Sequence, residues 1–116
     1  MNTAYVLVTL LTAAGTAGVA VADLVPAQFV LANSAEVGVP RSWLPALAMV
    51  KLAGAAGLVV GLVGPPMLGV AAATGLVLFF VGAVVTHLRA GVLYNIAFPL
   101  AYLGMSVAAL ALALLR

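Results

Sequence analysis

Charge is scarce in this sequence. Only 5% of its 116 residues are charged, whereas about a quarter of the residues in a soluble domain are charged. Hydrophobic residues make up 67% of the chain. A soluble domain of this size needs more polar surface than this composition provides, so the composition indicates a protein embedded in the lipid bilayer.

Cysteine is absent and histidine occurs once. Without cysteine the chain has no disulfide, no thiolate metal ligand and no thiol-based redox chemistry. One histidine and two acidic residues are too few for a zinc site or a bis-histidine haem. We therefore expect no metal and no cofactor, and four Lys and Arg residues in total do not form a nucleic-acid surface.

Long uncharged runs are what the sequence does contain. They cover residues 1–22, 52–86 and 90–115, and the middle run is broken at Gly64-Pro65-Pro66, where consecutive prolines stop a helix. A helix needs about 20 apolar residues to cross a bilayer. The sequence predicts an all-α membrane protein, a multi-pass protein of the cell membrane, with one domain over residues 1–116. Its four transmembrane helices are expected at about 3–22, 43–63, 67–89 and 93–115.

The connection between the first two helices, residues 23–42, is much longer than the other two. Pro26 favours the start of a short helix, which would lie at the membrane interface or fold back as a re-entrant cap. Two interpretations remain open: a plain amphipathic connector, or a lid over a pocket.

Lys51 is the unusual residue of the second helix. The uncharged stretch after it ends at Gly64, too short at about 1.5 Å per residue to cross a hydrocarbon core of about 30 Å. The span must therefore begin near Trp43, which places Lys51 about two turns inside it. An ammonium group at that depth requires a partner, and Asp23 and Glu36 are the candidates.

Polar residues gather at one end of the predicted bundle, which we call the polar pole. It holds Asp23, Glu36, Arg41, Lys51, His87 and Arg89, and Asn95 at the start of the last helix completes the ring. Asn95, Tyr102 and Ser106 are expected on one helix face, with the Asn95 carbonyl left free because Pro99 cannot donate to it. On the first helix Thr9, Thr12, Thr16 and Asp23 share a face that should point inward.

The polar pole has two open interpretations. In the first, an ion pair fixes helix register and nothing reacts. In the second, the pole lines a lipid-accessible pocket in which Asp23, Glu36 or His87 transfers a proton, while Lys51, Arg89, Asn95 and Tyr102 bind or support the ligand. His87 is equally consistent with an interfacial contact to lipid headgroups.

Small residues recur on three predicted helices. The sets are Ala14, Gly18 and Ala22; Ala53, Gly57 and Gly61; and Gly75 and Gly82. Such faces let helix backbones approach closely in a membrane. They serve either packing within one chain or a homo-oligomer.

The segment from Lys51 to Arg89, with GAVVTHLRAG at 82–91, VGVP at 37–40 and the terminal Arg116, resembles the DoxX-like family of small four-helix membrane proteins. That family is named after a subunit associated with a quinone-linked respiratory oxidoreductase, so the resemblance implies a membrane redox complex as partner. Of the polar positions of the family, the resemblance carries over only His87 and Arg89 as candidate site residues. Lys51 departs from the family, in which an acidic residue is frequent near this position.

Two functions from different classes follow. The first is an accessory or scaffold subunit whose polar pole contacts a partner protein, lipid or a lipophilic ligand. The second is a cofactor-independent, intramembrane acid–base enzyme, an isomerase, hydrolase or cyclase of a lipophilic isoprenoid- or epoxide-type substrate. The sequence leaves both open.

Overall fold

The computed structural model describes residues 2–115, and Arg116 lies outside them. Its regular elements are all helical: α1 (Thr3–Leu24), α2 (Gln28–Glu36), a 3₁₀ turn η1 (Arg41–Trp43), α3 (Leu44–Val63), α4 (Pro66–Ala90) and α5 (Ala97–Leu115). Four helical segments are long and apolar enough to cross a membrane, namely α1, η1 with α3, α4 and α5. The predicted all-α membrane fold with four spans is confirmed.

The ends of these helices follow local chemistry. The Asn2 side chain caps α1 by accepting hydrogen bonds from the backbone N–H groups of Ala4 and Tyr5. Pro66 occupies the first turn of α4, where no intrahelical donor is needed. Gly91 ends α4 with φ 71, a left-handed conformation that glycine adopts without a Cβ clash.

The last helix begins later than predicted. α5 starts at Ala97, so Asn95 lies in the preceding turn and not on a helix face with Tyr102 and Ser106. Its carbonyl is not free either, because the Phe98 N–H donates to it at 3.1 Å. The reason is that Pro99 falls in the first turn of α5, where its missing N–H removes no intrahelical bond. Similarly, Pro26 precedes α2 by two residues and does not open it.

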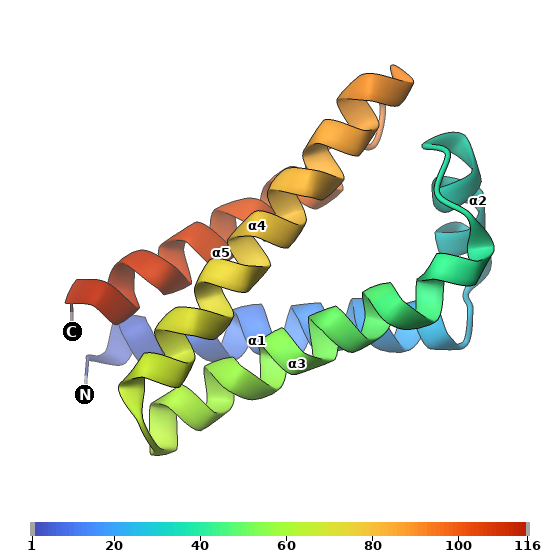
Figure 1. Ribbon diagram of the computed structural model, residues 1–116. Coiled ribbons are helices and arrows are strands. Elements are labelled where there is room, and N and C mark those ends of the chain that lie inside the picture. Colours follow the sequence, from blue (N-terminus) through green and yellow to red (C-terminus); the bar gives the residue numbers. More distant parts are fainter. Residues whose placement is uncertain (1, 116) are drawn as a thin grey trace.

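The helices form two pairs that diverge. α1 packs on α3 and α4 packs on α5, and the α3–α4 and α1–α5 contacts join the pairs. Figure 1 shows the pairs close together at the end that carries both chain termini and the turn after α3. They separate toward the opposite end, where α2 lies across the end of α1 and α3. The wide end is the predicted polar pole.

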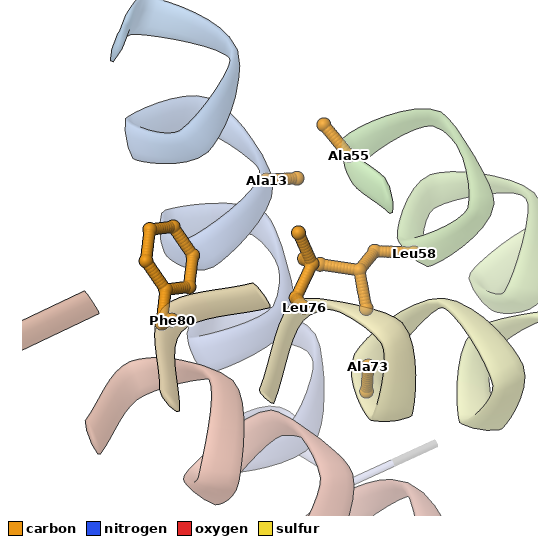
Figure 2. Close-up of a cluster of buried hydrophobic side chains, with 6 residues drawn as sticks. All are labelled: Ala13, Ala55, Leu58, Ala73, Leu76 and Phe80. Atoms are coloured by element: carbon orange, nitrogen blue, oxygen red, sulfur yellow. The ribbon is translucent and has the colours of Figure 1, made fainter. Parts of the chain in front are cut away.

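The middle of the bundle is closed by small and apolar side chains. Ala13, Ala55, Leu58, Ala73, Leu76 and Phe80 form the buried cluster shown in Figure 2. The predicted inward face of α1 is confirmed, since Thr9, Thr12 and Thr16 are at most 2% exposed.

Glycines bring α3 and α4 together at the narrow end. A Cβ on Gly61 would lie 2.4 Å from the Cα of Gly69, so the two backbones touch there. A Cβ on Gly57 would lie 2.7 Å from the Cβ of Ala72 on α4, so the helices are also close at this position. The small-residue face of α3 is therefore used within one chain. Gly18 on α1 has nothing within 4 Å of a built Cβ, and its face remains a predicted homo-oligomer contact.

Candidate functional site

A cavity of about 690 Å³ occupies the polar pole between the diverging helix pairs. All four spans and α2 contribute to its wall. Six of the seven candidate site residues line it: Asp23, Glu36, Lys51, His87, Asn95 and Tyr102. The structure thus brings together at one cavity residues that are up to 79 positions apart in the chain, from Asp23 to Tyr102.

Arg89 is the candidate that the cavity wall does not include. It is exposed, and it lies two residues after His87 on α4. Positions two apart on a helix point to different sides, so the two side chains cannot both face one cavity. The structure separates the two positions that the family resemblance had grouped.

The deepest polar group of the cavity is an ion pair between α1 and α3. Lys51 Nζ lies 2.6 Å from Asp23 Oδ2, and the two side chains are 9% and 3% exposed. The Phe79 ring lies 5.3 Å from the same ammonium, close enough for a cation–π interaction. Asp23, and not Glu36, is therefore the partner of Lys51, and the pair ties the end of α1 to the middle of α3.

A second polar group connects α2 to α4 and to the turn before α5. His87 is 5% exposed, and its Nδ1 lies 3.0 Å from the Ala83 carbonyl oxygen, one turn earlier. Its Nε2 lies 3.2 Å from Asn33 Oδ1, which also accepts a hydrogen bond of 2.9 Å from Asn95 Nδ2. Asn33 is the centre of this group and bridges two helices and a turn.

The geometry at Asn33 allows two arrangements of protons. A carbonyl only accepts, so His87 Nδ1 carries a proton in both. If the Asn33 oxygen faces Nε2, that nitrogen is protonated too and the ring is an imidazolium. If the Asn33 and Asn95 amides are both reversed, the Asn33 NH₂ donates to a neutral Nε2 and to the Asn95 oxygen. The two arrangements therefore differ in the direction of the two hydrogen bonds at Asn33, whereas the bond from His87 Nδ1 to the Ala83 carbonyl is the same in both.

Asn95 keeps one unpartnered amide atom in both arrangements. Its Oδ1 as placed is buried and has no hydrogen-bond partner in the described part of the chain. Reversing the amide puts the NH₂ group at that position instead. A buried amide atom without a partner is costly, so this point of the cavity wall is suited to a polar group of a ligand or to water.

Glu36 and Tyr94 form an outer polar contact at the rim. The Tyr94 hydroxyl donates to Glu36 Oε1 at 2.6 Å, and both residues are exposed. This hydrogen bond to a carboxylate favours the protonated phenol and raises the pKa of Tyr94 above its ordinary value of about 10. Glu36 thus links α2 to the turn before α5, the same two segments that the hydrogen bond between Asn33 and Asn95 connects.

Asn33 and Phe79 are site residues that sequence reasoning did not single out. Asn33 lies three positions before Glu36 on α2, a spacing that puts both on one helix face. That shared face was a usable signal. Phe79 follows an apolar run of α4 and carries no comparable signal, because only its position beside Lys51 distinguishes it.

Comparison with known protein families identifies the family of this chain. The sequence pattern of the DoxX-like family matches residues 7–109, which include every residue of the cavity wall. Searches of curated proteins and of solved structures found no match.

Proposed function

Because this multi-pass membrane protein belongs to the DoxX-like family, we propose that it is an accessory protein of the cell membrane that holds a lipophilic small molecule at its polar pole. The observation that carries the proposal is the cavity. Its volume of about 690 Å³ falls within the range of about 300–1,000 Å³ typical of small-molecule sites.

The wall of the cavity supports a ligand that is mostly apolar. Aromatic side chains contribute from four helical elements: Phe29 from α2, Trp43 from η1, Phe79 and Phe80 from α4, and Phe98 and Tyr102 from α5. A few polar groups converge among them, the combination by which a small-molecule site fixes a ligand's orientation. A position between membrane helices also favours a ligand that partitions into lipid.

An accessory role accounts for the way the polar groups are paired. Asp23 is held by Lys51, and both ring nitrogens of His87 have partners. Paired groups of this kind favour holding a ligand over reacting with it. In the role that the family resemblance implies, the protein would supply or store the ligand for a membrane redox complex.

Trp43 provides the test, because it is the only tryptophan of the chain and lines the cavity. In nanodiscs we expect saturable quenching of its fluorescence by a dibrominated fatty methyl ester. Gly82→Leu, which places a side chain on the cavity wall, should abolish the saturable part. Gly75→Leu is the matched control, since it lies one heptad earlier on α4, away from the wall.

Both glycines have open space around a built Cβ, so neither position is packed closely against a neighbouring helix. Quenching that rises in proportion to probe concentration, equally in wild type and in both variants, would reflect probe dissolved in the bilayer and would refute ligand binding.

The acid–base enzyme remains a second candidate, favoured by the presence of Asp23, Lys51 and His87 around a single cavity. Glu36 is less suited to proton transfer at depth because it lies at the exposed rim with Tyr94. Incubation with lipophilic epoxides followed by mass spectrometry would detect turnover. Product formed by wild type but not by Asp23→Asn or His87→Gln would favour the enzyme over the accessory role.

A further inference from the structure

The ammonium of Lys51 has unused hydrogen-bonding capacity inside the cavity. It carries three N–H donors, and Asp23 Oδ2 accepts one of them. Within residues 2–115 Nζ donates to no second acceptor, and the Phe79 ring lies 5.3 Å from it. Since Lys51 is only 7% exposed and lines the cavity, water has limited access to the remaining donors.

The charges of the wall determine which acceptor fits. Asp23 already neutralises Lys51 at 2.6 Å, so the pair has no net charge to attract an anion. Glu36 is the other acidic group of the wall, and it adds a negative charge at the rim. His87 adds no charge in the arrangement in which its Nε2 accepts from the Asn33 amide. An anionic headgroup would therefore lose its hydration without gaining an unpaired cation, which is unfavourable in a low-dielectric site.

A cationic headgroup fits no better beside the pair. It would supply no acceptor for the free donors of Lys51, and its positive charge would lie against the Lys51 ammonium. What the pair lacks is an acceptor oxygen without charge. Hydrogen bonds from an ionised donor are stronger than those between neutral groups, so even one such contact discriminates between ligands.

We propose that the cavity selects an uncharged lipophile whose carbonyl-type oxygen accepts a hydrogen bond from Lys51 Nζ. This inference rests on the proposed function and specifies its ligand class. The Asp23–Lys51 pair then acts as a neutral donor site: Asp23 holds the ammonium in place and cancels its charge, and Lys51 orients the oxygen. The apolar remainder of the ligand lies along Phe79 and Phe80.

Four probes with the same dibrominated chain test this selection by quenching of Trp43 in nanodiscs. They end in a methyl ester, a carboxylate, a quaternary ammonium or a plain hydrocarbon. We expect the ester to bind about 10- to 100-fold more tightly than the hydrocarbon, as for a hydrogen bond to a charged group. The carboxylate and the ammonium should bind at least about 10-fold more weakly than the ester.

Lys51 is then replaced without leaving a buried unpaired charge. The double variant Asp23→Leu with Lys51→Met removes the ammonium, puts no other donor in its place and keeps the site neutral. It should bind the ester no better than the hydrocarbon while still showing saturable binding of both. Gly75→Leu should keep the wild-type preference, because it lies outside the wall.

The outcomes separate the two proposals. If no probe gives saturable quenching, the proposed function fails. If binding is saturable but the carboxylate or ammonium equals the ester, or the double variant keeps the ester preference, the ligand class assigned here is wrong and the binding function stands.

Discussion

Replacing Lys51 by Met tests how much the Asp23–Lys51 pair contributes to the stability of the fold. The substitution keeps an unbranched side chain of similar length but leaves Asp23, whose side chain is 3% exposed, without its counter-ion. Removing one partner of a buried pair costs about 3–5 kcal/mol. Asp23→Asn should cost a similar amount, because it leaves the ammonium unpaired.

The distances in the structure explain why the double variant should behave differently. At the observed 2.6 Å, two unit charges attract by about 6 kcal/mol at an effective dielectric constant of about 20. Desolvation of the two ions costs several kcal/mol each and offsets most of this. The double variant Asp23→Asn with Lys51→Met should therefore lie within about 1 kcal/mol of wild type, although each single variant is strongly destabilised.

The assay is reversible unfolding of the purified protein in mixed micelles, titrated with dodecyl sulfate and followed by helical circular dichroism. The four proteins form a double-mutant cycle, and we expect a coupling energy of about 5 kcal/mol or more, since each single variant costs at least about 3 kcal/mol and the double variant about 1 kcal/mol. If the two single costs simply add in the double variant, Asp23 and Lys51 do not act as a pair and the reasoning fails.

Three further predictions concern packing, the rim and α2. Gly61→Ala should destabilise the protein by about 1–3 kcal/mol in the same unfolding assay, because its Cβ would meet the α4 backbone. Gly75→Ala, with open space, should be neutral or gain up to about 1 kcal/mol, and equal stability of the two would contradict the contact. Glu36→Gln should lower the pKa of Tyr94 toward about 10, measured by tyrosinate absorbance with Tyr94→Phe as the control that identifies the Tyr94 signal. Since the pKa of Tyr94 is raised in the folded state, the stabilisation is complete below about pH 10 and disappears as the phenol ionises at higher pH. A titration unchanged by Glu36→Gln would exclude the Glu36 contact. Asn33→Ala should speed amide hydrogen exchange in α2 about 10-fold or more while leaving α3 unchanged, and exchange as slow as in wild type would show that the amide bridge does not hold α2.

The fold was predictable because a few residues determine it. Long runs that are apolar at every position favour helices over barrel strands in a bilayer, and Gly64-Pro65-Pro66 divides the middle run where the turn occurs. The depth of Lys51 followed from helix geometry alone, and its need for a carboxylate followed from that depth. Helix geometry did not predict that Asp23 and not Glu36 would be the partner of Lys51, because that choice depends on how α2 folds back after α1.

The less predictable parts of the site depend on tertiary structure. Asn33 acquires its role only when α2 places it between His87 and Asn95. The start of α5 was misjudged because Pro99 is compatible with a helix that begins before it or at it, and local sequence does not choose between these. Arg89 was grouped with His87 by the family resemblance, whereas helix periodicity places the two side chains on different sides of α4.

The contact between Gly61 and Gly69 has a mechanical consequence for the opposite end of the molecule. It joins α3 and α4 at the narrow end, whereas His87 lies 18 residues further along α4, about 27 Å away at 1.5 Å per residue. A tilt of α4 by about 5° around this fulcrum would move His87 by about 2 Å, enough to break a hydrogen bond of 3.2 Å. A small rotation at the contact between Gly61 and Gly69 would therefore produce a larger displacement of α4 at the cavity.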